Sequence, residues 1–152
     1  MSSQSDVQAE EAIHAHHREL RDGLRARVLA AVDAARGGQA HDDTRDALLA
    51  YLDGELLPHA AAEEIALYPA GETGASELLV RAMREEHRNL VAHVGELRTA
   101  GDAMTTATTA SAILALFESH LSKENDLLIP VLLADPGVSL AGLLGGMHEL
   151  VG

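Results

Sequence analysis

Two short stretches of this sequence each place a histidine and a glutamate four residues apart within a run of apolar residues. The stretch HAAAEEIALYP covers residues 59–69, and HLSKENDLLIP covers residues 120–130. Because residues at i and i+4 lie on the same face of an α-helix, both pairs take inward positions if the apolar residues around them form a buried stripe. Any fold of this chain must therefore bury the two pairs and compensate their charge.

Glycine and proline breaks divide the chain into long segments that lack the polar and apolar alternation typical of strands. The breaks are Gly37-Gly38, the GETG of residues 71–74, Gly101 and Pro136-Gly137. Since short connections favour antiparallel neighbours, we predict an all-α chain, an up-down-up-down antiparallel four-helix bundle with a short C-terminal helix. The predicted parts are a flexible N-terminal tail over residues 1–11, the bundle over residues 12–134 and an amphipathic helix over residues 135–152.

Each predicted helix has an inner stripe at helical spacing that includes a histidine. The first stripe carries Ile13, His17, Leu20, Leu24 and Ala31, and the second carries Leu48, Leu52, Leu56, His59, Glu63 and Leu67. The third carries Leu79, Met83, Leu90, Val94 and Leu97 with His87 toward one edge, and the fourth carries Ile113, Phe117, His120, Glu124, Leu127 and Val131. Pro58 is expected to kink the second helix, and Pro130 is expected to mark where the fourth begins to end.

The histidines of the four stripes fall at one level of the predicted bundle. In an antiparallel pair, residues equally far from the shared loop lie opposite each other, at a rise of about 1.5 Å per residue. His17 and His59 lie at similar numbers of residues from the first loop. The same holds for His59 and His87 across the second loop, and for His87 and His120 across the third. We therefore expect the four imidazoles to converge, with a glutamate close to two of them.

A converging set of histidines and glutamates on apolar stripes predicts a metal site. Burying an uncompensated charge costs on the order of several kcal/mol, and the stripes hold no Lys or Arg to neutralise Glu63 and Glu124. A pair of divalent or trivalent cations offsets that cost, with bridging carboxylates and terminal imidazoles. The chain has no cysteine, so nitrogen and oxygen donors favour iron or manganese over a structural zinc, although a single zinc is an alternative.

Charge and composition argue against several classes of partner. The net charge is −13 with histidine neutral, which opposes binding to nucleic acid or to an anionic membrane surface. The N-terminal MSSQSDVQAEEA lacks the basic and apolar regions of a signal peptide, and no run of about 18 apolar residues marks a membrane span. We therefore expect a cytoplasmic protein, a monomer or homodimer, without nucleic-acid or membrane partners.

The order of these residues resembles the hemerythrin-like, or HHE cation-binding, family. The pattern H, H-x-x-x-E, H, H-x-x-x-E is carried by His17, His59/Glu63, His87 and His120/Glu124, with LYP after one pair and LIP after the other. The resemblance covers most of the chain. It implies a four-helix bundle with two non-heme iron ions, with or without an oxo or hydroxo bridge, in which the histidines are terminal ligands and the glutamates are bridging ones. It also implies that the site handles dioxygen, peroxide or nitric oxide.

One position departs from the oxygen-carrying members of that family. Those proteins have two histidines four residues apart on the third helix, whereas the residue four positions after His87 is Val91. An unfilled ligand position favours redox turnover, as in a peroxidase, a catalase-like enzyme or a nitric oxide-reactive enzyme of a stress response, supplied by a separate electron donor. The alternatives are an oxygen or nitric oxide sensor or carrier, and an iron-handling protein without turnover.

Several residues near the pattern have more than one interpretation. Tyr68 is either an additional ligand or a hydrogen-bonded tyrosine at the edge of the core. His16 replaces His17 as the ligand if the helical phase is shifted by one residue. Glu86 either bonds to a ligand imidazole or is solvated, and His93 is expected at the boundary of the site.

The remaining polar and apolar positions have simpler interpretations. The histidines expected at the surface are His14, His41 and His148. The tail repeats apolar residues at helical spacing, at Leu140, Leu143, Leu144, Met147 and Leu150. This tail helix is expected to dock on the bundle or on a second subunit.

Overall fold

The computed structural model describes residues 3–151, and within that range the chain contains helices and short connections but no β-strand. The predicted all-α class is confirmed. The α-helices are α1 (Gln4–Arg36), α2 (Asp42–Tyr51), α3 (Leu57–Ala62), α4 (Glu77–Arg98), α5 (Ala103–Lys123), α6 (Ile129–Ala134) and α7 (Leu140–Val151). Wider π-helical turns are η1 (Leu52–Leu56), η2 (Glu63–Leu67) and η5 (Glu124–Leu128), and 3-10 turns are η3 (Tyr68–Gly71) and η4 (Gly74–Ser76).

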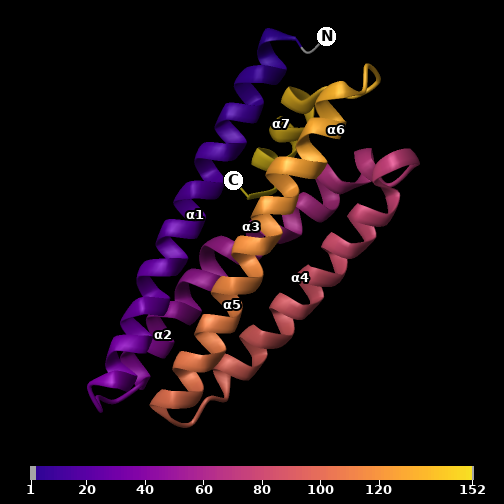
Figure 1. Ribbon diagram of the computed structural model, residues 1–152. Coiled ribbons are helices and arrows are strands. Elements are labelled where there is room, and N and C mark those ends of the chain that lie inside the picture. The colour runs from indigo at the N-terminus through magenta and orange to yellow at the C-terminus, as the bar shows by residue number, and fades with distance from the viewer. Residues whose placement is uncertain (1–2, 152) are drawn as a thin grey trace.

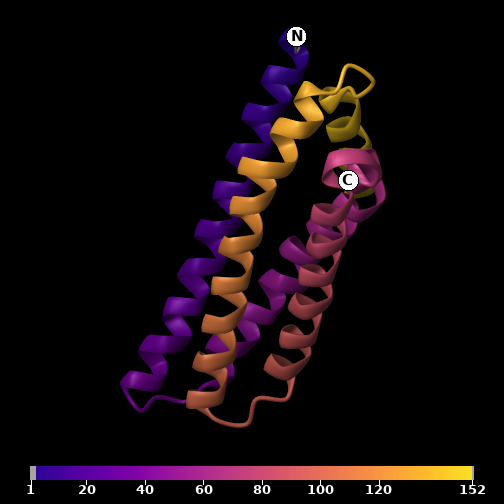
Figure 2. The same cartoon turned by 45° about the vertical axis from the view of Figure 1, so that its right-hand side comes forward.

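These elements form long rods that pack into a helical bundle (Figure 1, Figure 2). The rods are α1, the run from α2 through η1 to α3, α4, and the run from α5 through η5 to α6. α5 packs against both α1 and α4, and α1 also packs against α2. The short α7 lies on α1, α3 and η2, near the N-terminal end of α1. Among the helices described, none is both long and apolar enough to cross a membrane.

The N-terminal segment is more ordered than its composition indicates. Residues 4–11, predicted to belong to a flexible tail, form the first turns of α1, whereas residues 1–2 lie outside the described residues. The Ser3 hydroxyl accepts a hydrogen bond from the Asp6 amide, and Ala9 is buried. Asp6 Oδ1 accepts a hydrogen bond of 2.9 Å from the Ala141 amide, and this bonding lowers the pKa of the Asp6 carboxyl. The segment is held by α7, a contact distant in sequence.

One residue separates each π-helical turn from a proline. The N–H of that residue, which is Leu57, Tyr68 or Ile129, bonds to the carbonyl five residues earlier, and the next residue is Pro58, Pro69 or Pro130. In a regular α-helix a proline offers no N–H to the carbonyl four residues earlier, and its ring clashes with that carbonyl. The wider turn relieves both problems. The distortion predicted at Pro58 takes this form, whereas Pro130 does not begin to end the last rod, which continues to Ala134.

The turn η5 also changes which residues face inward. Leu127 and Val131 were predicted to be inner positions, yet they are 53% and 39% exposed. Leu128 and Leu132 are buried instead. Because η5 contains an extra residue, the inward positions after it lie one residue later than predicted.

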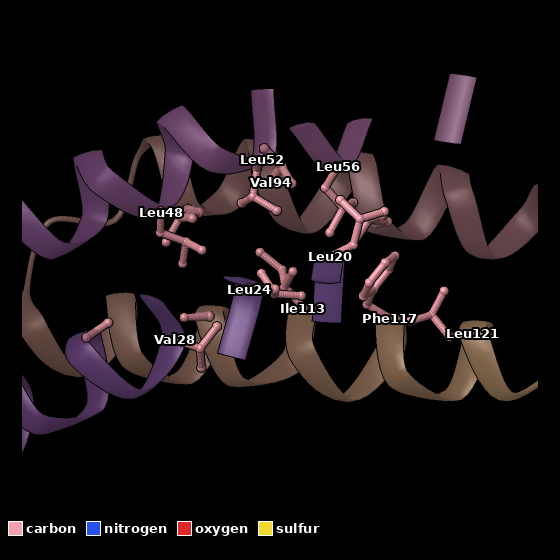
Figure 3. Packing of buried hydrophobic residues seen from close by; sticks show 14 residues of the cluster. Leu20, Leu24, Val28, Leu48, Leu52, Leu56, Val94, Ile113, Phe117 and Leu121 are labelled. Carbon is pink, nitrogen blue, oxygen red and sulfur yellow. The ribbon is translucent and has the colours of Figure 1, made fainter. Parts of the chain in front are cut away.

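Two apolar clusters fill the interior. The first cluster includes Leu20, Leu24, Val28, Leu48, Leu52, Leu56, Val94, Ile113, Phe117 and Leu121, which interdigitate between the rods (Figure 3). The second cluster includes Ile13, Leu67, Tyr68, Val80, Met83, Leu128, Ile129, Leu132 and Met147. Along each rod the predicted histidines lie between residues of the first cluster and residues of the second. A polar layer therefore separates the two cores.

Candidate metal centre

The polar layer contains all of the predicted ligand residues, and each is buried. The rods contribute His17 from α1, His59 and Glu63 from α3 and η2, His87 from α4, and His120 and Glu124 from α5 and η5. The convergence expected from the loop distances is thus present in the structure. His17, rather than its neighbour His16, faces the interior, since the His16 side chain is 48% exposed.

The donor atoms of these residues form two groups that share a glutamate. One group consists of His17, His59, Glu63 and Glu124, and the other of Glu63, His87 and His120. Within each group, one nitrogen or oxygen from every residue lies within 4.8 Å of the others. Such spacing allows each group to surround one ion.

The two carboxylates each divide their oxygens between the groups. Glu63 Oε2 lies 3.5 Å from His59 Nε2, whereas Glu63 Oε1 lies 3.6 Å from His87 Nε2. Glu124 Oε1 lies 3.0 Å from His17 Nε2, whereas Glu124 Oε2 lies 3.2 Å from His120 Nε2. A carboxylate with one oxygen toward each of two neighbouring sites has the geometry of a bridging ligand.

While its histidines are neutral at Nε2, the first group contains buried atoms that the protein leaves without hydrogen bonds. These atoms are His17 Nε2, His59 Nε2, Glu63 Oε2 and Glu124 Oε1. Among residues 3–151, His14 Nε2 is the one other buried side-chain atom in this condition. An unsatisfied buried polar atom costs about 1–3 kcal/mol. The residues therefore fit a cation, since one ion at this point would satisfy all four atoms together.

The outer nitrogens of three histidines are held by acceptors from other rods. The Nδ1 contacts are His17 with Asn125 Oδ1 at 2.6 Å, His87 with Glu64 Oε1 at 3.0 Å and His120 with Glu86 Oε1 at 3.3 Å. A histidine that donates from Nδ1 keeps the Nε2 lone pair free. All four Nε2 atoms point into the polar layer, which is the orientation that a metal ligand requires.

Of these three acceptors, the sequence interpretation considered Glu86 and missed Glu64 and Asn125. Lys123 Nζ lies 2.6 Å from Glu86 Oε2 and holds that carboxylate in place. The two missed residues directly follow Glu63 and Glu124, at the start of η2 and η5. In the sequence, a polar residue directly after each inward glutamate could have indicated these two hydrogen-bond acceptors.

Comparison with known families agrees with this geometry. The model of the hemerythrin HHE cation binding domain matches residues 8–132. The chain belongs to the hemerythrin HHE cation-binding family. Neither the search of curated proteins nor the search of solved structures returned a match. The matched region contains every residue of the polar layer, and α7 lies beyond it.

Tyr68 lies beside the second group of this HHE domain and is fully buried. Its hydroxyl donates a hydrogen bond of 3.0 Å to Glu124 Oε2 and lies 3.2 Å from His87 Nε2 and 3.0 Å from His120 Nε2. Tyr68 is the first residue of the 3-10 turn η3, directly after the π-helical turn η2, and its side chain is buried there. Burial, and then the charges of Glu63 and Glu124, raise the pKa of the Tyr68 phenol well above its usual range.

The position of Val91 corrects one sequence expectation. Val91 is 56% exposed on α4, so it leaves no ligand position empty beside His87. Met83, one helical turn before His87, is fully buried and belongs to the same cluster as Tyr68. The inward position four residues from His87 is therefore residue 83. The group around His87 is occupied by a phenol rather than left open.

Neighbouring charges shift the pKa values of the histidines and carboxylates in the polar layer. Burial acts to lower the pKa of His17, but the neighbouring Glu124 and Glu63 outweigh it and raise that pKa to about 10. Burial acts to raise the pKa of Glu63, but the charge of His59 and contacts with Glu124 and His17 bring it well below its usual range. Without a metal, protons on His17 and His120, whose pKa values are both raised, would compensate the two carboxylates.

The other histidines differ in their relation to the centre. His93, expected at the boundary of the site, lies 3.3 Å from Glu96. His41 contacts Asp42 and Arg45 and has no contact with the centre. The His14 side chain is partly buried rather than fully at the surface. His148 is exposed, as expected, yet it also lines a cavity beside the centre.

That cavity has a volume of about 130 Å³ and reaches the first group. Its lining includes all four members of that group, whereas His87 and His120 do not contribute. The other walls come from α1, from α3 and η2, and from α7. The helix α7 packs on the bundle, which was one of the two positions predicted for it. A small molecule in the cavity would thus meet the centre on the side of His17 and His59.

Proposed function

We propose that this HHE domain is an up-down-up-down four-helix bundle that holds two non-heme iron ions and acts on a small oxidant. The observation that carries the proposal is the division of each carboxylate between the two groups. His17 and His59 would hold one ion, His87 and His120 the other, and Glu63 and Glu124 would bridge them. The nitrogen and oxygen donors, without sulfur, suit iron.

Iron in this centre would supply Lewis acidity and redox chemistry toward peroxide, dioxygen or nitric oxide. The residues of the chain orient and protect it. Asn125, Glu64 and Glu86 fix imidazole tautomers, and the apolar clusters on both sides exclude water. Tyr68 either completes the second group as a ligand or keeps its proton close to Glu124 Oε2.

Redox turnover in an oxidative or nitrosative stress response is the function we favour. The supporting observation is the Tyr68 hydroxyl, which places a proton within hydrogen-bonding distance of a bridging carboxylate. Electrons would come from a separate donor, and the setting would be cytoplasmic. Reversible binding of dioxygen or nitric oxide is the second candidate, because the apolar cavity admits a small neutral gas. Peroxide consumption by the iron-loaded protein separates the two, since a carrier or sensor would bind oxygen without consuming peroxide.

The decisive experiment measures iron content. The purified chain should hold about two iron ions, as expected for carboxylate-bridged bundle sites. Glu63→Ala or Glu124→Ala should remove both ions, because each carboxylate is shared, whereas His41→Ala should retain them. A full complement of iron in either glutamate variant would contradict the bridging assignment.

A further inference from the structure

The cavity beside the centre lies between the HHE domain and α7. On the domain side its apolar walls include Ile13, Ala62 and Leu67, and on the α7 side they include Leu144, Met147 and Val151. Met147 is only 4% exposed, so α7 forms a closely packed wall there. The family match ends at residue 132, so this wall is built by a segment outside the matched domain.

The cavity is larger than the oxidants considered above. Its volume is about 130 Å³, whereas a water molecule takes about 30 Å³ in the liquid and an apolar protein cavity of about 150 Å³ binds benzene. Peroxide and dioxygen are close to water in size and would leave most of the space empty. The space accommodates a compact body of several carbon atoms.

The lining also restricts the charge of a ligand. The residues that line the cavity include no Lys or Arg, and the acidic groups among them are Glu63 and Glu124. An anion would lie beside these two buried carboxylates with no Lys or Arg in the walls to compensate it, and burying it would be costly. At the inner end, the buried polar residues of the first group, His17, His59, Glu63 and Glu124, form a floor that offers a place for one polar end. Apolar walls and a polar floor together favour an uncharged molecule with one oxygen-bearing end.

We propose that this cavity binds a small uncharged molecule with a compact apolar body and one hydroxyl or hydroperoxyl end, of the size of a four-carbon branched alcohol or hydroperoxide. The apolar body lies against Met147 and Leu67, and the oxygen faces the polar floor. The orientation of the oxygen rests on the proposed iron function. The binding of the apolar body does not.

The methionines provide a test with internal controls. Met147 lines the cavity, Met83 is fully buried in the same apolar cluster without lining it, and Met104 is 65% exposed elsewhere. In the full chain loaded with zinc, a diamagnetic substitute, tert-butanol should shift the ¹³C-methyl resonance of Met147 saturably. The resonances of Met83 and Met104 should stay in place. No saturable shift of Met147, or an equal shift of Met83, would overturn the proposal.

Variants that fill the cavity sharpen this test. Ala62 is buried in the cavity wall, whereas its neighbour Ala61 is exposed and does not line it. Ala62→Leu should abolish the saturable shift, and Ala61→Leu should leave it unchanged. Val151→Phe, at the exposed edge of the cavity, should also weaken binding and does not disturb a packed position. Equal titration curves in the wild type, Ala62→Leu and Val151→Phe would count against the cavity as the binding site.

Iron content, measured on a separate preparation of the purified chain, distinguishes this inference from the proposed function. In a second titration, tert-butyl hydroperoxide replaces tert-butanol. The two compounds share the same apolar body, so the Met147 resonance should shift in the same way. A chain that shows the Met147 shift but holds no iron would contradict the iron centre and support the cavity. A chain that holds iron but shows no Met147 shift with either compound would support the iron centre and contradict the cavity as a binding site.

Discussion

Tyr68 places one hydroxyl within hydrogen-bonding distance of Glu124, His87 and His120. At the scale of single residues, this contact changes the interpretation of the site more than any other. From the sequence alone, a tyrosine next to Pro69 was either a ligand or a residue at the edge of the core. The structure gives its location, which is interior, and its role as a ligand stays a prediction.

Removing this hydroxyl tests that role. If the phenol binds iron as a tyrosinate, the cation reverses the effect of the surrounding carboxylates on the phenol proton. The iron-loaded protein should then show a visible ligand-to-metal absorption band that is lost in Tyr68→Phe. Tyr51→Phe is the matched control, because the Tyr51 hydroxyl bonds to the carbonyl of Leu20 rather than to the centre. Identical visible spectra of the wild type and Tyr68→Phe would contradict tyrosinate ligation.

At the scale of elements, the π-helical turns explain both the success and the failure of the sequence interpretation. The inner stripes of the first two helices, and the converging histidines, followed from regular helical spacing and loop distances. After Glu124 the spacing is not regular, so Leu127 was placed inward in error and Leu128 was missed. The π-helical turns themselves precede Pro58, Pro69 and Pro130 in turn, so a proline within an apolar helical stripe was the available warning.

Other features depended on contacts that periodicity does not encode. The hydrogen bond from the Ala141 amide to Asp6 joins residues 135 positions apart. The position of Asn125 beside His17 depends on how two rods pack, as does the cavity wall formed by α7. Local spacing predicts which face of a helix is buried, but it does not specify which distant backbone group a polar side chain meets.

The shifted register in η5 predicts a contrast between two adjacent leucines. Leu128 is fully buried, so Leu128→Ala should lower the free energy of unfolding by about 2–5 kcal/mol, as expected for a buried leucine that leaves a cavity. Leu127 is 53% exposed, so Leu127→Ala should change the free energy of unfolding by no more than about 0.5 kcal/mol. Denaturant unfolding of the two variants measures the difference. Equal losses would contradict the register described for this turn.

At the scale of the whole molecule, we expect the polar layer to make stability depend on metal. Glu63 and Glu124 are both buried with no Lys or Arg among their ion-pair partners in the described part of the chain. An ion that binds the folded state alone stabilises it by mass action, by about 2.7 kcal/mol at a free concentration one hundred times its Kd. Removal of iron should therefore lower the melting temperature, and returning iron should restore it. Calorimetric scans that coincide with and without iron would rule out a buried metal centre.

The separation of the two apolar clusters also bears on the cooperativity of unfolding. The chain has no tryptophan and two tyrosines; Tyr51 packs against the first cluster and Tyr68 belongs to the second. The centroid of the Tyr51 ring lies 4.2 Å from the Arg27 guanidinium carbon, whereas the centroid of the Tyr68 ring lies 5.6 Å from the Arg84 guanidinium carbon. Near-ultraviolet circular dichroism of Tyr51→Phe and Tyr68→Phe thus reports on one half of the molecule at a time. Loss of the two signals at different denaturant concentrations would mean that the bundle unfolds as two units joined across the polar layer, rather than as one.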